Sequence, residues 1–440
     1  MRCAPGNIIC RHMFPVNAAV MVSQMSGSSA DNGPSAKKRI ILTGISTNVL
    51  VLGIVSLLTD MSSEMIYPIM PLFLTAIGAS GLVIGLIEGA AETTASLIKV
   101  FSGWYSDRYR KRKPFILSGY GSSSVVKPVL YLATAPWHVL GLKVLERIGK
   151  GVRSAPRDAL IADSTDRRYR GRAFGFHKAM DSTGAVIGPL LVLPVLLAAS
   201  AVTTDTYRLI FLISAIPAFV GVAIIVLFVR DREAESAGKV GRFFGEVSHL
   251  GRPFYLLLFI VMTFYIGEIS YAFFILRAAE EGFSMFGLPD IATIILLYVL
   301  YNIVFVVFAL ITGGISDRLG RKPVIAMSFI LFAMTCVVMS ITGSYALLVA
   351  GFALFGTYKG SSEGVLKAYV TDVAPKHLRG TALGTFHTAV GLVMLPGGIV
   401  AGLLWDSVGH WATFAYGVAM ALAALVLLIS FGPGREQQIN

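Results

Sequence analysis

The chain is poor in charged residues and in cysteine, and it lacks the short motifs of common catalytic sites. Only 14% of its 440 residues are charged, against roughly 25% in a soluble domain, which is too few to cover a folded surface in water. Cys3, Cys10 and Cys336 have no CxxC or Cys/His spacing, which argues against a disulfide framework or a metal site. No HExxH pair or nucleotide-binding motif is present, so we expect neither an enzyme nor a cofactor.

Apolar residues make up 55% of the chain, a balance opposite to that of disordered proteins. A run of about 20 apolar residues is long enough to cross a hydrocarbon core of about 30 Å. The sequence contains twelve such runs, near 43–77, 82–104, 115–134, 137–161, 173–199, 207–229, 253–276, 291–312, 323–343, 345–371, 381–404 and 410–431. Short connecting loops predict one all-α integral membrane bundle of twelve transmembrane helices.

Lysine and arginine residues gather in alternate loops. With a cytoplasmic N-terminus, the cytoplasmic loops hold the basic clusters at 108–113, 167–172, 230–252, 318–322 and 376–379. The outer loops have almost none. This positive-inside pattern predicts a multi-pass protein of the inner (plasma) membrane with both termini in the cytoplasm. The net charge of +12 is therefore mainly a topology signal and does not indicate nucleic acid as a partner.

The most polar internal stretch, 230–252, divides the spans six and six. We expect a six-helix half on each side of this cytoplasmic loop, at 43–229 and 253–431. The remaining residues form cytoplasmic tails at 1–42 and 432–440. The first tail contains a Ser/Gly/Pro-rich stretch and no signal-peptide core, so we expect it to be disordered.

An internal repeat relates the two halves. GWYSDRYRKRKP at 103–114 matches GGISDRLGRKP at 313–323, which places Asp107 and Asp317 210 residues apart. At an offset of 209, Lys150-Gly151 matches Lys359-Gly360, and Asp163 matches Asp372. Parallel six-helix repeats predict a secondary transporter with its substrate site between the halves near the bilayer midplane.

At these residues the sequence resembles the major facilitator superfamily, over about 43–431. The loop signature of that family, G-x-x-x-D-R-x-G-R-[RK], is complete at Gly313, Asp317, Arg318, Gly320 and Arg321. The first half keeps Gly103, Asp107, Arg108 and Arg112 but has Arg110 in place of the second glycine. A second signature, R-x-x-x-G-x-x-x-A, is similar to Arg147, Gly151 and Ala155.

A third motif is similar to the span-five signature of the drug:proton antiporter-type exporters. It is matched at Gly175, Gly184, Gly188 and Pro189, but Val192-Leu193 replace its last two glycines. The resemblance implies two pseudo-symmetric six-helix halves, alternating access and proton-driven export. Small residues allow neighbouring helices to approach closely, and generic helix packing is the alternative explanation of this motif.

The loop motif has a physical interpretation of its own. Asp107 and Asp317 fall at cytoplasmic helix ends beside arginines with which they can form charge-assisted pairs. Pairs that exist only when the cytoplasmic side is closed would make this loop a gate. The alternative is a solvated basic loop that only sets topology.

Ionisable residues at membrane depth are costly unless paired or hydrated, so each is a functional hypothesis. In span 137–161, seven charged residues from Lys143 to Asp158 share a face about 140° wide. Tyr67, Pro68 and Pro71 are expected to interrupt the first span. The candidate proton and substrate path comprises Asp60, Glu64, Tyr67, Glu88, Glu92, Lys127, Arg147, Lys150, Arg153, Arg157, Asp181, Glu268, Tyr298, Asn302, Lys359, Glu363 and Lys367.

Two interpretations of this set stay open. In the functional one, Asp60, Glu64, Glu88 or Glu92 accepts a transported proton, and the basic face of span 137–161 attracts an anion. In the structural one, acids and bases are nearly balanced and hold helices together as pairs. The favoured function is a monomeric proton-coupled exporter of a small organic solute or drug, anionic if the basic face binds it. The alternatives are an importer or facilitator of an organic anion or metal chelate and, more remotely, a membrane-embedded enzyme.

Overall fold

A computed structural model describes residues 46–109, 111–199, 201–231, 247–284 and 288–433, without the side chains of 103, 104, 107–109 and 167. The compact unit described below comprises residues from 44 onward. The expected tail 1–42 lies outside the described residues, as do most of the loop 230–252 and of the tail 432–440.

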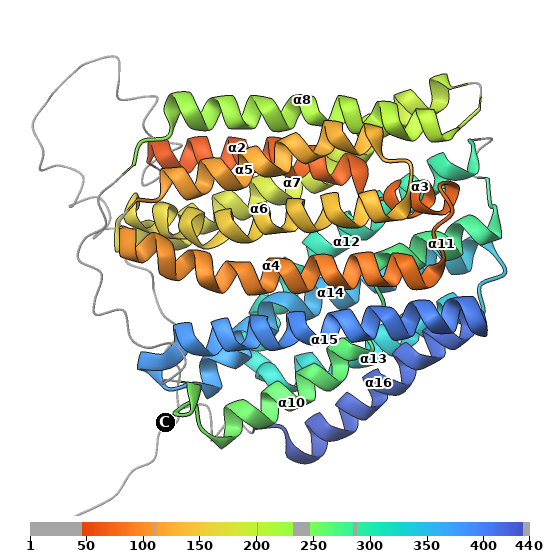
Figure 1. Ribbon diagram of the computed structural model, residues 1–440. Coiled ribbons are helices and arrows are strands. Elements are labelled where there is room, and N and C mark those ends of the chain that lie inside the picture. The colour runs from red at the N-terminus through yellow and green to blue at the C-terminus, as the bar shows by residue number, and fades with distance from the viewer. Residues whose placement is uncertain (1–45, 110, 200, 232–246, 285–287, 434–440) are drawn as a thin grey trace, which may run out of the picture. The chain divides into compact units, whose positions relative to one another are not determined.

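The described residues fold into helices that make twelve crossings, six before residues 232–246 and six after them (Figure 1). The first six are α2–α3 (Thr47–Ile66 and Met70–Ala76), α4 (Gly81–Tyr109), α5 (Lys113–Val129), α6 (Pro136–Asp163), α7 (Arg170–Ala198) and α8 (Thr204–Phe228). The second six are α10–α11 (Arg252–Ile266 and Tyr271–Glu281), α12 (Asp290–Leu319), α13 (Arg321–Ser340), α14 (Tyr345–Val373), α15 (Arg379–Ser407) and α16 (His410–Phe431). The prediction of an all-α membrane protein with twelve spans is confirmed.

Nine crossings in the described residues are long and apolar enough to span a membrane by composition alone. The other three are α5, α6 and α14. The α5 helix has only 17 residues, whereas α6 and α14 carry ionisable side chains that line the interior of the bundle. Interior charges therefore account for the lower hydropathy of α6 and α14.

Two crossings are broken near their middle. The first ends at Ile66 and resumes at Met70, because Pro68 has no N–H to donate to the preceding turn. The break between α10 and α11, at Gly267–Ser270, contains no proline and was not expected. The Ser270 hydroxyl caps the new helix by accepting a hydrogen bond from the N–H of Ala272.

Glycines bring the two halves into close contact along α4 and α15, which lie side by side (Figure 1). A Cβ on Gly89 would lie 2.8 Å from the Leu395 Cα, and one on Gly402 would lie 2.6 Å from the Leu82 Cα. Such distances are too short for any larger residue. The α4–α15 contact thus depends on small residues, as expected for close helix pairs in membranes.

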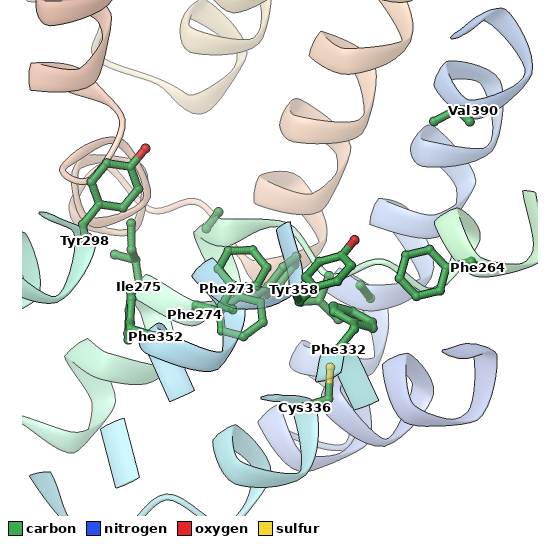
Figure 2. Packing of buried hydrophobic residues seen from close by; sticks show 14 of the residues in the cluster. Phe264, Phe273, Phe274, Ile275, Tyr298, Phe332, Cys336, Phe352, Tyr358 and Val390 are labelled. Carbon is green, nitrogen blue, oxygen red and sulfur yellow. The ribbon is translucent and has the colours of Figure 1, made fainter. Parts of the chain in front are cut away.

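Aromatic side chains fill the core of the second half, where Figure 2 shows Phe264, Phe332 and Tyr358 close together. The ring centroids of Phe332 and Tyr358 are 4.9 Å apart, and those of Phe264 and Phe332 are 5.3 Å apart. This packing fixes the Tyr358 ring, so its hydroxyl has a defined position beside the cavity described next.

Candidate transport cavity

A cavity of about 590 Å³ is lined by helices from both halves. Sixteen of the seventeen path candidates line it: Asp60, Glu64, Tyr67, Glu88, Glu92, Arg147, Lys150, Arg153, Arg157, Asp181, Glu268, Tyr298, Asn302, Lys359, Glu363 and Lys367. They come from positions up to 307 residues apart, and the fold brings them to one space.

Lys127 is the exception, because its side chain does not line this cavity. Its ammonium group is buried between α5 and α2, where it donates hydrogen bonds to Ser62 Oγ at 2.5 Å and Ser63 Oγ at 3.2 Å. Only Ser63 of these partners reaches the cavity wall. The face of α5 that carries Lys127 packs against α2, and hydropathy alone does not reveal which neighbour a helix face meets.

Ion pairs between α4 and α6 neutralise one part of the wall. Lys143 Nζ lies 3.0 Å from Glu88 Oε1, and Arg147 Nη2 lies 3.1 Å from Glu92 Oε1. Both cations also lie over the ring of Tyr67, at 5.2 and 5.5 Å from its centroid. These residues form a connected, partly buried network in which each formal charge has a partner.

The wall of the second half is neutralised by two further pairs. Lys359 pairs with Glu268, whose carboxylate also accepts a hydrogen bond from the Tyr358 hydroxyl at 2.7 Å. One turn further along α14, Lys367 lies 2.9 Å from Glu363. The break between α10 and α11 places Glu268 where it can reach α14.

The side chains of Asp181 and Arg157 also have polar or ionic partners. The carboxylate of Asp181 accepts a hydrogen bond from Ser56 and lies 3.6 Å from His177 Nδ1. Arg157 pairs with the adjacent Asp158 at 3.0 Å.

A smaller set of charges on the wall has no ionic partner within the described ranges. The charged groups of Asp60, Lys99 and Lys150 make neither an ion pair nor a hydrogen bond there. Arg153 stacks on Tyr120, with 4.1 Å from its guanidinium to the ring centroid, and Nη1 reaches only Ser123 Oγ at 3.4 Å. The uncommitted charge of the wall is thus mostly positive.

Three hydrogen bonds cross the cavity between the halves. Tyr298 donates to Glu64 Oε2 at 2.8 Å, and Tyr271 reaches Glu88 Oε1 at 3.5 Å. Asn302 Nδ2 donates to the carbonyl of Ala185 at 3.2 Å. Glu64 makes no ion pair in the described part of the chain, so its bond to Tyr298 joins a carboxylate directly to the other repeat.

The cavity is more enclosed at one end, called the closed end below, than at the other. At the closed end, the Asp406 carboxylate of α15 accepts hydrogen bonds from the N–H groups of Gly81 (2.7 Å) and Leu82 (2.8 Å) at the start of α4. Nearby Glu88 is 6% exposed, whereas Glu363, toward the opposite end, is 49% exposed. That opposite end carries the loops around Arg112 and Arg321 and is called the basic end below.

The loop motif forms matching clusters at the basic end. Arg321 lies 2.6 Å from Asp317 and 3.1 Å from Asp372 and donates to Ser316 Oγ. In the first half, Arg112 lies 3.6 Å from Asp163 and donates to Ser106 Oγ at 2.8 Å. The other motif residues of the second half make no such contact with the described residues: Arg318 is exposed, and a Cβ on Gly313 would meet no atom within 4 Å. In the first half, the surroundings of Gly103 and the side chains of Asp107 and Arg108 are not described.

Gly320 has a φ of +96°, a conformation that only glycine adopts readily. The position of Arg110, which replaces this glycine in the first half, lies outside the described residues. The loop in the second half therefore requires its glycine.

The glycine motif of α7 packs against α2 at two of its three glycines. A Cβ on Gly184 would lie 2.6 Å from the Leu57 carbonyl oxygen, and one on Gly188 would lie 2.9 Å from the Glu64 Cβ. A Cβ on Gly175, by contrast, would meet no atom within 4 Å. Gly175 thus has no close-packing role, and Pro189 lies within the continuous α7 helix.

Several wall residues were missed by sequence reasoning. They are mainly hydroxyls and rings, including Ser96, Ser154, Ser182, Phe305, Phe355 and Phe386. Helical spacing could have found two of them, since Ser96 and Ser154 lie one turn after Glu92 and Lys150. Helical periodicity predicts that Lys143 lies on the charged face of α6, but it does not predict that Glu88 is the partner of Lys143. No cluster of three His, Cys, Asp or Glu side chains that could hold a metal occurs among the described residues.

A membrane bundle of two repeated halves around a shared ionisable cavity is the architecture of a secondary transporter. The Major Facilitator Superfamily model matches residues 52–297 and 289–439. The chain belongs to this superfamily.

The relatives of the chain are transporters rather than enzymes. An uncharacterized MFS-type transporter of Methanocaldococcus jannaschii is 37% identical over 387 residues, covering 88% of this chain and 95% of the relative. Multidrug resistance protein 2 of Bacillus subtilis is 25% identical over 372 residues, covering 81% and 88%. A crystallised nucleoside transporter has the same fold, with a TM-score of 0.72, 14% identity and coverage of 87% and 98%.

Proposed function

We propose that the protein is a proton-coupled exporter of a small organic anion or drug. The basic end faces the cytoplasm of a cell whose plasma membrane holds the protein, because basic loops stay on that side. One chain supplies both walls of the cavity, so the monomer is the working unit. Export is supported by the α7 motif and by the Bacillus subtilis relative, which is named a multidrug resistance protein.

The observation that carries proton coupling is the bond between Glu64 and Tyr298. Four other carboxylates of the wall, those of Glu88, Glu92, Glu268 and Glu363, each face a lysine or arginine. Glu64 instead accepts a hydrogen bond from a neutral hydroxyl on the other repeat. A carboxylate without a cationic partner is the easier one to protonate, because no ion pair has to be broken.

Protonation of Glu64 would change how firmly the halves are joined. Hydrogen bonds to an ionised carboxylate are about twice as strong as neutral ones. A proton on Glu64 therefore weakens the Tyr298 contact and favours rearrangement of the halves. The Arg112–Asp163 and Arg321–Asp372 clusters each lie within one half, and both are formed while the basic end is the more exposed one, so they stabilise the helix ends of each half rather than close that end.

The test uses everted membrane vesicles that pump protons inward and report the pH gradient with a quenched dye. Anionic, neutral and cationic organic compounds are added in turn, and an exported substrate should collapse part of the gradient. Glu64→Gln should abolish this response, whereas Glu363→Gln, at a carboxylate held in a local pair, should keep it. Vesicle uptake of such a compound that ignores the proton gradient would instead identify a facilitator and refute coupling.

A further inference from the structure

The two repeats place one lysine each at equivalent points of the cavity. Lys150 on α6 and Lys359 on α14 are 209 residues apart, and each precedes a glycine. A Cβ on Gly151 would lie 3.0 Å from the Ala95 carbonyl oxygen, and one on Gly360 would lie 2.5 Å from the Phe305 carbonyl oxygen. Because Ala95 and Phe305 are also related by the repeat, the same helix contact positions both lysines.

Their surroundings differ. The charge of Lys359 is cancelled by Glu268, whose side chain is 2% exposed and is held by Tyr358. Lys150 is exposed to the cavity and has no ionic or hydrogen-bonding partner for its ammonium group in the described part of the chain. The equivalent of Tyr358 in the first repeat is Gly149, which has no hydroxyl to hold a carboxylate.

Arg153 adds a second uncommitted cation to the same face of α6. It lies one turn from Lys150, and its partners are the Tyr120 ring and the Ser123 hydroxyl rather than a carboxylate. Among the wall carboxylates that the structure describes, Asp60 has no partner and Glu64 has only the neutral Tyr298 hydroxyl. The whole cavity wall carries eight lysine or arginine side chains against seven carboxylates, which leaves one unbalanced positive charge.

The opposite wall is aromatic. The rings of Tyr301 and Phe355 stack with centroids 5.0 Å apart, and those of Tyr298 and Tyr301 lie 5.6 Å apart. A cavity of about 590 Å³ falls within the roughly 300–1,000 Å³ of sites for drug-sized ligands. Ring faces provide stacking surface for a planar apolar body.

We propose that Lys150 and Arg153 form the anion subsite, and that the transported solute is an aromatic monoanion whose ring lies against the second half. Lys359 takes no part, because Glu268 already neutralises it. This inference rests on the proposed transport function but not on the direction or the proton coupling of transport.

The experiment measures binding to the purified full chain in detergent, without any gradient. The probes are 1-naphthoate, 1-naphthamide, 1-naphthylmethylammonium and octanoate. We expect naphthoate to bind tightest. Lys150→Gln should weaken naphthoate binding about tenfold to hundredfold, the loss of one charge-assisted hydrogen bond, and Lys150→Arg should restore most of it.

The matched control is Lys322→Gln, at a lysine that does not line the cavity and that donates hydrogen bonds to the carbonyls of Ile429 and Gly432. It should bind naphthoate as the parent does, and thermal unfolding checks that each variant is folded. The inference is overturned if naphthoate does not bind, if the amide, ammonium or octanoate probe binds equally well, or if Lys150→Gln has no effect. It is also overturned if the control loses as much affinity as Lys150→Gln. Failure of proton coupling in vesicles would leave these binding results intact.

Discussion

Asp406 supplies a helix cap across the boundary between the repeats, and removing its charge should open the closed end of the cavity. The start of α4 is capped locally by Ser80, whose hydroxyl accepts from Val83, while Asp406 accepts from Gly81 and Leu82. Asp406→Asn keeps the shape but turns an amide NH₂ toward one of these N–H groups. The contact that joins α15 to α4 is then lost in part.

The size of the effect follows from the chemistry of caps. Replacing a capping side chain costs about 0.5–2 kcal/mol, and the exposure of the Asp406 site favours the lower part of this range. Only the closed state makes the contact, so the whole loss acts on the equilibrium between closed and open. The population that is open at this end should rise about twofold to fivefold.

The assay is the labelling rate of a cysteine introduced at Ser182, a cavity residue, by a membrane-impermeant thiol reagent outside intact cells. Native Cys336 is buried, and Cys3 and Cys10 are replaced by serine. The control is Asp205→Asn, because Asp205 pairs with Arg208 of its own helix at 3.0 Å. An unchanged or slower rate in Asp406→Asn would show that this cap does not hold the end closed.

Two further predictions concern packing and charge. Lys143→Met leaves the buried carboxylate of Glu88 without its cation and should lower the free energy of unfolding by about 3–5 kcal/mol. Adding Glu88→Gln should recover most of this loss, as measured by thermal unfolding. The pairing would be contradicted if the single and the double variant were equally stable. Gly398→Val would place a side chain against the Gly85 carbonyl of α4, so the α4–α15 contact should loosen and cavity labelling should accelerate. Gly175→Ala, in open space, should leave both the labelling rate and the thermal unfolding unchanged.

The fold was largely predictable because lipid imposes a simple rule on sequence. Each crossing requires a long apolar run, and Pro68 marks the break in the first one. The second break was not predictable in this way, since Gly267 and Ser270 are common within membrane helices. There the chain leaves the helix where a Cβ on Gly267 would overlap the Met420 side chain.

The candidate site was predictable as a set but not as a set of pairs. Ionisable residues at membrane depth have few places to go other than an interior cavity, which is why most of the candidates line one. Which acid meets which base depends on how separate helices dock. Glu268, in the break between α10 and α11, and Lys359, on α14, are 91 residues apart. Lys127 shows that a buried lysine can also be satisfied by serine hydroxyls.

The repeats agree at the basic end and differ in the cavity, and the two facts have one physical reason. Arg112 with Asp163 and Arg321 with Asp372 make the same kind of contact in each half, because related helix ends can use the same geometry twice. A solute without two-fold symmetry cannot occupy two equivalent half-sites. In the proposed anion subsite only Lys150, of the two related lysines, is free to meet the solute, because the charge of Lys359 is neutralised by Glu268. The chemistry of the solute is accordingly to be sought at the positions where the repeat is broken.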